Sequence, residues 1–163
     1  MNPLSPDDLA RLLDRYAPAL ALYARQWCDC PDDVVQEAFI KLASQATPPD
    51  NIAAWLYRVV RNGAIGHSRS ARRRTQREAA VALRRDPWFE SRPQDRLDGQ
   101  AAAQALQGLL AEQREVVVAR LWGDLPFAEI AALIGQPTST VHRWYQQGLE
   151  ALRERLGVPC PKK

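Results

Sequence analysis

The sequence predicts an all-α protein with two small helical domains joined by a linker, the second domain containing a helix-turn-helix. Apolar residues recur at steps of three and four through most of the 163 residues, the period of helices with one buried face. No segment alternates between apolar and polar residues for long enough to predict a strand. A polar stretch with two prolines and a glycine interrupts the period at residues 86–100, so the predicted domains are residues 1–85 and 101–163.

The first domain is predicted to contain three helices. Pro18 lies within the first and is expected to kink or break it, because proline removes a backbone donor and crowds the preceding turn. The second begins at Pro31, where Asp32 and Asp33 suit the positive end of the helix dipole. The residues predicted to face the core are Leu9, Leu12, Leu13, Tyr16, Leu20, Tyr23, Ala24 and Trp27 in the first helix, and Val35, Ala38, Phe39 and Leu42 in the second.

Asp50 or Asn51 is expected to cap the third helix, since each follows a proline-rich turn and carries a side-chain oxygen. Gly63 and Gly66 each cost about 1 kcal/mol relative to alanine inside a helix. We therefore expect either a bend at these glycines or another group that approaches the backbone closely. The inward residues are predicted to be Ile52, Trp55, Leu56, Val59 and Val60.

The linker contains two adjacent aromatic residues, Trp88 and Phe89. They predict that the linker docks onto one of the domains instead of forming a free coil. The helical period then returns after Ala101 and continues through a second set of apolar residues. This set comprises Leu106, Leu109, Leu110, Val116, Val117, Ala119 and Leu121.

Residues 127–146 have the layout of a helix-turn-helix. Ala131 permits a close helix crossing and Gly135 permits the turn. Thr138 or Ser139 is expected to cap the second helix, where its exposed donors could meet DNA. Ile130 and Ile134 are predicted to fill the inner face of the first helix, and Val141 and Tyr145 to anchor the second. An ordinary helical hairpin is the alternative that these spacings disfavour.

Charge divides the chain into segments of opposite sign. Residues 1–50 carry four basic and eight acidic side chains, whereas residues 61–77 carry six arginines and no acid. Clustered arginine binds a phosphate backbone of any sequence, because each contact releases condensed counterions. The first segment therefore suits a protein partner and the second suits nucleic acid. A solvated helix face is the alternative for the arginine run.

Several classes of function are disfavoured. No run of eighteen apolar residues or signal-peptide pattern is present, so we expect a cytoplasmic protein without a membrane span. Cys28, Cys30 and Cys160, with only His67 and His142, lack the spacing of a metal site. No cofactor is expected, and reduced thiols are favoured over an oxidation sensor. The sequence has no paired acid and base at catalytic spacing and no phosphate-binding loop. We therefore expect neither an enzyme nor a small-molecule substrate.

Three segments carry a resemblance to a known family. They are DDVVQEAFIKLAS at residues 32–44, AAWLYRVVRN at residues 53–62 and EQREVVVARLWGDLPFAEIAALIG at residues 112–135. Together with the arginine run and the helix-turn-helix, they resemble a bacterial sigma factor of the extracytoplasmic-function group, in the sigma-70 family. The resemblance implies that residues 1–85 are region 2, that residues 101–163 are region 4, and that the protein directs promoter-specific transcription initiation by core RNA polymerase.

The resemblance also implies three binding surfaces. Asp32, Asp33, Gln36, Glu37 and Ile40 match the surface that meets the beta-prime clamp helices of the polymerase. The surface that recognises and melts the minus-10 element matches Tyr57, Arg61, Asn62, Arg69, Arg72, Arg73 and Arg74. The surface that reads the minus-35 duplex matches Thr138, Ser139, Thr140, His142, Arg143 and Gln146. The implied partners are core polymerase, through its clamp helices and beta flap, and promoter DNA, both duplex and single-stranded. An anti-sigma factor is a further candidate partner.

Within the minus-10 surface, individual roles are implied for several side chains. Asn62, expected on a loop beside the glycines, matches the residue that holds a flipped base, and an amide can satisfy the polar edge of a base. The arginines would follow the phosphates. Between the two nearby aromatics, the helical period assigns Trp55 to the core and leaves Tyr57 to contact nucleic acid. An asparagine that merely ends a helix is the alternative for Asn62.

Two other functions remain open. A dimeric repressor or activator would bind operator DNA through residues 101–156 and dimerise through residues 5–60. That function would leave the acidic motif and the arginine run without a role. An adaptor that binds the polymerase or an anti-sigma factor without melting DNA would have a nonfunctional region around Asn62.

Overall fold

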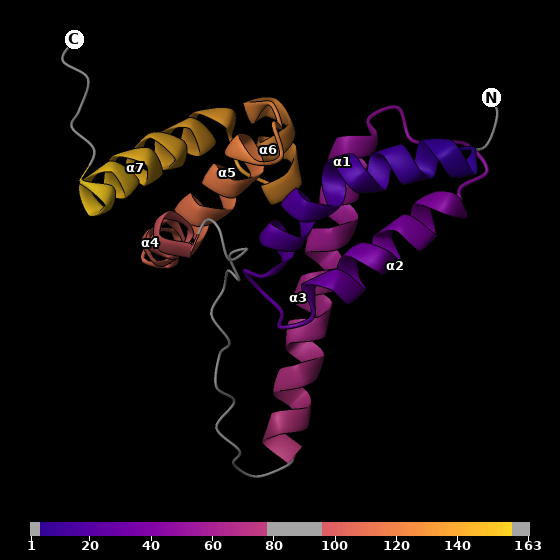
Figure 1. Ribbon diagram of the computed structural model, residues 1–163, viewed down its shortest axis with the longest axis horizontal. Helices are drawn as coiled ribbons and strands as arrows, with labels where there is room; N and C mark the ends of the chain where they lie inside the picture. The colour runs from indigo at the N-terminus through magenta and orange to yellow at the C-terminus, as the bar shows by residue number, and fades with distance from the viewer. Residues whose placement is uncertain (1–3, 78–95, 158–163) are drawn as a thin grey trace. The chain divides into compact units, whose positions relative to one another are not determined.

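A computed structural model of the protein describes residues 4–77 and 96–157. Among these residues there are seven helices and no strand, in agreement with the predicted all-α class (Figure 1). The chain divides into two compact units, residues 1–86 and 87–163. Trp88 and Phe89, whose docking the sequence predicts, lie outside the described residues. Residues 96–100, which the sequence assigns to the linker, are helical.

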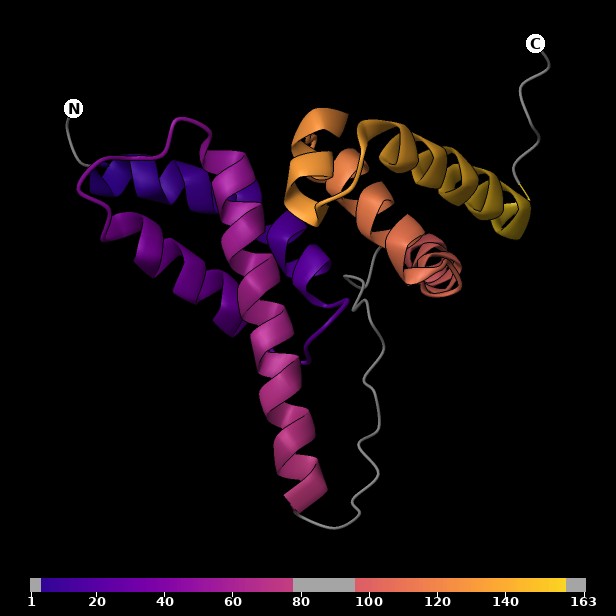
Figure 2. The same cartoon turned by 180° about the vertical axis from the view of Figure 1, so that it is seen from behind.

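The first unit packs three helices together, and each contacts the other two. They are α1 (Pro6–Ala24), α2 (Pro31–Ala43) and α3 (Ile52–Arg77). Figures 1 and 2 show that α1 and α2 lie against the N-terminal part of α3, whose C-terminal part extends beyond them. The side chains buried among the three helices include Leu20, Tyr23, Val34, Ala38, Leu42, Leu56, Tyr57 and Val60.

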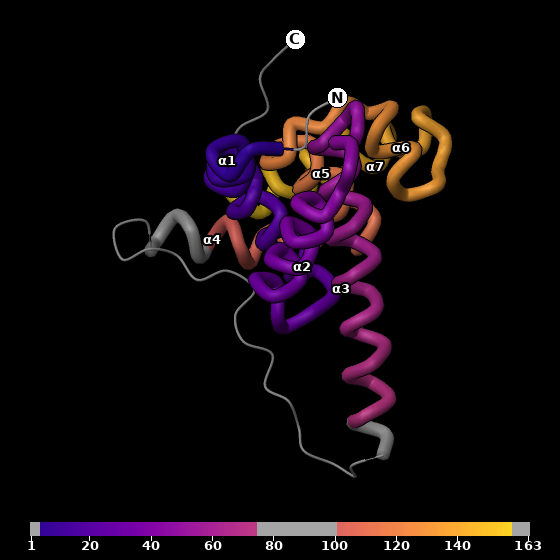
Figure 3. Tube along the Cα trace, turned by 90° about the vertical axis from the view of Figure 1, so that its right-hand side faces the viewer, coloured from indigo at the N-terminus to yellow at the C-terminus, as the bar shows by residue number. Residues whose placement is uncertain are grey.

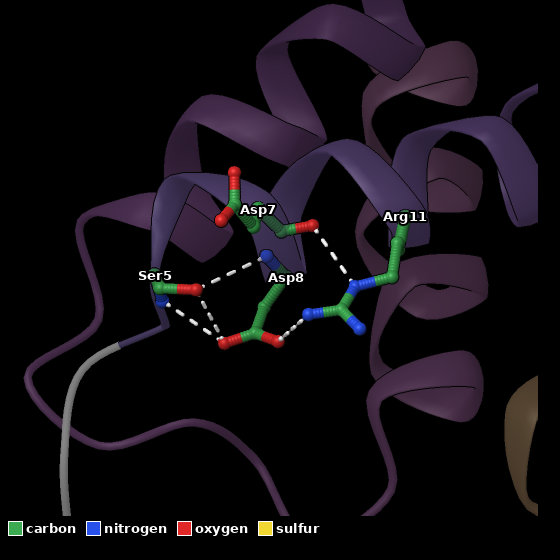
Figure 4. Close-up of polar contacts among 4 residues, drawn as sticks. All are labelled: Ser5, Asp7, Asp8 and Arg11. Atoms are coloured by element: carbon green, nitrogen blue, oxygen red, sulfur yellow. Dashed lines mark hydrogen bonds and ion pairs between the residues drawn. The ribbon is translucent and has the colours of Figure 1, made fainter.

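A capping box begins α1 and is drawn in Figure 4. The backbone N–H of Asp8 donates to Ser5 Oγ at 3.2 Å, and the backbone N–H of Ser5 donates to the Asp8 carboxylate at 3.3 Å. Two backbone donors that the helix leaves unpaired are satisfied in this way. The hydrogen bonds from Ser5 are also the main reason that the pKa of Asp8 lies below its usual value. Pro18 does not break α1, but Figures 1 and 2 show the helix changing direction along its length.

The N-terminal cap of α3 and the course of the helix at its two glycines were both left open by the sequence. Asn51 is the cap, because its Oδ1 accepts the backbone N–H of Ala54 at 3.0 Å. The helix continues through both glycines. A Cβ added to Gly63 would lie 3.1 Å from Val34 Cγ1, so α2 approaches the backbone closely there. Gly66 has no such neighbour within 4 Å.

The described part of the second unit contains four helices, and α7 contacts the other three. They are α4 (Arg96–Gln107), α5 (Ala111–Leu121), α6 (Phe127–Ile134) and α7 (Thr138–Leu156). A short turn joins α6 to α7, which lie next to each other in the Cα trace of Figure 3. Gly148 allows α7 to approach α5, since an added Cβ would lie only 2.8 Å from Val117 Cγ2. Fully buried side chains of this unit include Val116, Val117, Val118, Ile130 and Val141.

Candidate functional site

One side of α2 is exposed along its length and carries most of the helix's charge. Its residues follow the spacing i, i+1, i+4, i+5 and i+8, which keeps them on one face of a helix. The opposite side faces the core, and Phe39 is 8% exposed there, as expected. The exposed residues, which we call the acidic face, are Asp32, Asp33, Gln36, Glu37 and Ile40.

The chemistry of the acidic face suits a protein partner. Its three carboxylates would repel phosphate, and the one basic residue of α2, the exposed Lys41, lies in the last turn beyond them. Ile40 is 57% exposed at its end and offers apolar contact area. Acidic groups beside an apolar side chain fit a basic protein surface that also offers apolar contact.

The C-terminal part of α3, which extends beyond α1 and α2, carries most of the arginines of the predicted arginine run. Arg69, Arg72, Arg73 and Arg74 are all exposed, and no acidic residue occurs on α3 up to this point. We call these four the arginine segment. Arg61 differs from them, because its guanidinium lies 5.7 Å from the centroid of the Trp27 ring and is half-buried. The exposed arginines can follow a phosphate backbone, whereas Arg61 also packs against the three-helix unit.

Asn62 is exposed within α3, so the expectation that it lies on a loop is wrong, as is the alternative that it ends a helix. The helix continues because neither following glycine breaks the backbone hydrogen-bonding pattern. Asn62, Gly66, Arg69 and Arg73 are spaced i, i+4, i+7 and i+11 and therefore share one face. Gly66 leaves an open position on this face, between the Asn62 amide and the arginines.

Tyr57 is fully buried, so the prediction that it contacts nucleic acid is wrong. Its ring meets Tyr23 edge-on with centroids 4.9 Å apart, and burial raises the pKa of its phenol above the usual value. The Tyr57 hydroxyl has no hydrogen-bond partner among the described residues. Trp55, assigned to the core, is instead half-buried. The buried stripe of α3 runs through Leu56, Tyr57, Val60 and Ala64, rotated from the stripe inferred from sequence.

Helices α6 and α7 form the predicted helix-turn-helix. Gly135 ends α6 with φ of +70°, in the left-handed region that favours glycine, and its N–H donates to the Ala131 carbonyl at 2.9 Å. The predicted cap at Thr138 or Ser139 is wrong, because α7 already begins at Thr138. The preceding residue, Pro137, accepts the backbone N–H of Val141 at 3.1 Å. Both hydroxyl side chains thus lie in the first turn of the helix.

The outer side of α7 repeats the spacing of the acidic face. We call its exposed residues the recognition face. Thr140, which the sequence included in this set, is half-buried, because it turns toward the packed side of the helix. The recognition face consists of Thr138, Ser139, His142, Arg143 and Gln146.

His142 is held in place by an aromatic cluster that sequence reasoning missed. Its ring centroid lies 4.2 Å from that of Phe127, whose ring also meets Tyr145 edge-on at 5.1 Å. The guanidinium of Arg120 lies 5.2 Å from the Phe127 centroid, and its Nη1 donates to the Leu125 carbonyl at 3.0 Å. These contacts join α5, α6 and α7, and only the aromatic character of Phe127 could have hinted at them.

Two further features of the described part of the chain concern metal ligands and long apolar helices. No group of three or more His, Cys, Asp or Glu side chains there could hold a metal ion. None of its helices is long and apolar enough to cross a membrane.

Comparison with known families identifies both units. Sigma-70 region 2 matches residues 12–74, and sigma-70 region 4 matches residues 99–152. The first match contains the acidic face and the arginine segment, and the second contains the helix-turn-helix. No curated protein sequence matches the chain.

Solved structures of similar fold include two protein complexes. The sigma factor RpoE from Bartonella quintana, in complex with the anti-sigma factor NepR, is 24% identical with a TM-score of 0.76, over 94% of this chain and 99% of RpoE. CnrH, in complex with the cytosolic domain of CnrY, is 23% identical with a TM-score of 0.63, over 96% of this chain and 92% of CnrH. With both regions matched, the chain belongs to the sigma-70 family of RNA polymerase sigma factors, as its resemblance to the extracytoplasmic-function group implied.

Proposed function

We propose that this sigma factor binds core RNA polymerase through the acidic face of α2 and melts the promoter at α3. In the same complex, α7 reads the minus-35 duplex. The observation that carries this proposal is the exposed strip on α3, where an amide, an open glycine position and two arginines follow one another. An amide beside an open position suits a base, and arginines suit the phosphates that follow it.

The polymerase step draws on charge and apolar contact together. Carboxylates on the acidic face would steer the factor toward a basic surface such as the clamp helices of the beta-prime subunit. Ile40 would then be buried in the interface, where its apolar side chain would add to affinity. The beta flap is the partner that we assign to region 4.

The melting step requires an energy source, because extruding a base costs a few kcal/mol. The amide of Asn62 can both donate to and accept from the polar edge of an extruded base. The absence of a side chain at Gly66 leaves space for that base against the helix. Arg69 and Arg73, on the same face, would bind the phosphates of the captured strand.

The recognition face of α7 is assigned to the minus-35 duplex. Thr138 and Ser139 in the first turn can donate to phosphates, which positions the helix without reading sequence. His142, Arg143 and Gln146 follow at helical spacing and can reach base edges in a major groove. The stacking of His142 on Phe127 limits the directions in which its ring can turn.

An anti-sigma factor is proposed as a further partner. The solved structures of RpoE and CnrH are complexes with NepR and with the cytosolic domain of CnrY. A regulator of this kind would compete with the polymerase for the acidic face or for exposed apolar side chains of region 4. Those side chains include Leu121 and Trp122, which are 50% and 45% exposed.

The test is run-off transcription with purified core polymerase on a genomic DNA library, comparing wild type with Asn62→Ala. We expect specific start sites that Asn62→Ala weakens or moves. Gln45→Ala is the matched control, because it removes an exposed amide outside the three surfaces. Binding to core without specific starts would favour the adaptor. Failure to bind core would contradict the proposal and leave the dimeric duplex-binding regulator.

A further inference from the structure

Three reactive side chains meet at the edge of the acidic face, although one of them is distant in sequence. Cys30 directly precedes α2, Glu37 lies on α2, and His67 lies on α3. Cys30 Sγ is 3.6 Å from His67 Nδ1, and His67 Nε2 is 3.6 Å from Glu37 Oε1. All three are at least partly open to solvent. A thiol, an imidazole and a carboxylate are thus arranged in series.

The order of these groups selects one tautomer of the imidazole. An ionised carboxylate only accepts hydrogen bonds, so His67 faces Glu37 favourably when Nε2 carries its proton. In that tautomer Nδ1 has a lone pair directed at Cys30, and the thiol is the donor. His67 can therefore take the thiol proton, and the imidazolium that forms lies beside the Glu37 carboxylate. This arrangement places a proton acceptor beside the Cys30 thiol.

The neighbouring cysteine has the opposite environment. Cys28 is 7% exposed, and its thiol donates to the Ala24 carbonyl at 3.6 Å. Burial, with a smaller contribution from the Cys30 side chain, raises the pKa of the Cys28 thiol to about 11. Thiolates are the nucleophiles in thiol chemistry, so a buried neutral thiol is unreactive. Of these two cysteines, only Cys30 combines exposure with a proton acceptor.

The position of Cys30 connects its chemistry with the acidic face. Cys30, Asp33 and Glu37 are spaced i, i+3 and i+7, which aligns them along one side of α2. A group attached to the Cys30 sulfur would therefore lie beside two residues of that face. It would also occupy the space next to His67, whose helix carries the arginine segment.

We propose that Cys30 is a modification site for small disulfides and that its adduct weakens binding to core polymerase. The thiol proton passes to His67 Nδ1, and the Cys30 sulfur attacks one sulfur of the disulfide. The sulfur–sulfur bond of the reagent breaks as the mixed disulfide forms. The leaving group departs as a thiolate, and the proton on His67 passes to it or, where its thiol is acidic, to water, so one thiol group is consumed and one is released. The polymerase part of this proposal rests on the function proposed above.

The chemical part is tested with 5,5′-dithiobis(2-nitrobenzoic acid), an aromatic disulfide that releases a coloured thiolate. The full chain carries Cys160→Ser, so that only Cys28 and Cys30 can react. We expect one fast equivalent, mapped to Cys30 by peptide mass, that Cys30→Ser removes and Cys28→Ser retains. His67→Gln should slow it by about tenfold, whereas the control His142→Gln in the second unit should not. A fast thiol mapped to Cys28, or an unchanged rate in His67→Gln, would overturn the proposal.

The functional part is tested with protein converted by glutathione disulfide, a tripeptide disulfide that adds charge and bulk. We expect the adduct to bind core polymerase about tenfold more weakly, with full recovery after reduction by dithiothreitol. Cys30→Ser exposed to the same reagent should bind as it did before. Equal binding by adduct and reduced protein would overturn the link to polymerase. Failure of the reduced protein to bind core would instead contradict the proposed function and leave the Cys30 chemistry intact.

Discussion

The exposed faces of α2 and α7 have the same geometry and opposite chemistry. Each places five side chains at i, i+1, i+4, i+5 and i+8 on a helix whose other side is buried. The face of α2 has three carboxylates, an amide and an isoleucine, and that of α7 has two hydroxyls, an imidazole, a guanidinium and an amide. Helical periodicity therefore locates a binding face, but side-chain chemistry determines whether protein or DNA can occupy it.

The two helices also differ in how their buried sides are supported. Behind α2, a Cβ added to Gly63 of α3 would lie 3.1 Å from Val34 Cγ1, a longer approach than the 2.8 Å between a Cβ added to Gly148 and Val117 Cγ2. Behind α7, Gly148 packs against Val117, which is fully buried. The support of the recognition face is therefore the tighter of the two, and we expect substitutions there to cost more stability.

The largest expected effect is reversal of charge on the acidic face. Asp33→Lys combined with Glu37→Lys should lower affinity for core polymerase by about 100-fold, because like charges across an interface cost several kcal/mol. Fluorescence anisotropy of labelled protein with core enzyme measures this. The control is Asp14→Lys with Asp50→Lys, which reverses two exposed acids elsewhere in the unit. Equal losses in both double variants would mean that net charge, not the acidic face, governs binding.

A smaller effect is expected when the recognition face loses its cation. Arg143→Ala should weaken binding to a minus-35 duplex by about 1 to 3 kcal/mol, because it removes a contact to a base edge. The duplex is taken from start sites mapped by run-off transcription and compared with a scrambled version. Arg153→Ala, an exposed arginine in the last turn of α7, serves as the control. A similar loss on the scrambled duplex would assign Arg143 to phosphate contact instead of sequence recognition.

The support behind the recognition face is tested by Gly148→Ala. The new Cβ would lie 2.8 Å from Val117 Cγ2 and 3.4 Å from Gln113 Cβ. Overpacking of this kind costs about 1 to 3 kcal/mol, and removal of a glycine from a helix returns about 1 kcal/mol. We expect a net loss of about 1 kcal/mol in the free energy of unfolding, measured by urea denaturation. A stability equal to or above that of the wild type would show that α5 and α7 can separate without cost.

The smallest expected effect has the opposite sign. Gly66→Ala adds a Cβ with no atom within 4 Å, so it should raise the free energy of unfolding by about 0.5 to 1 kcal/mol. The same substitution should weaken the start sites that Asn62→Ala weakens, because it fills the space assigned to the extruded base. Thermal denaturation and run-off transcription of one preparation measure both. Greater stability with unchanged transcription would remove Gly66 from the proposed melting surface.

Much of the fold and part of the candidate site were predictable from local patterns. Helical period and turn residues predicted the buried side of α2, the helix-turn-helix and the cap at Asn51 or its neighbour. The same patterns failed at the aromatic residues of α3, where they assigned Trp55 to the core and Tyr57 to the surface. The helical period alone could not show that Tyr57 would pack edge-on against Tyr23 while Trp55 stayed half-buried.

By itself, the sequence determined the class of the fold, the faces of α2 and α7 and the separation of acidic from basic segments. These properties depend on the helical repeat and on side-chain charge, which act over a few neighbouring residues. Only the tertiary structure brought Cys30 to His67 and Phe127 to His142, and only it continued α3 through Gly63 and Gly66. Such contacts depend on where helices cross, and a crossing is decided by packing among residues far apart in the chain.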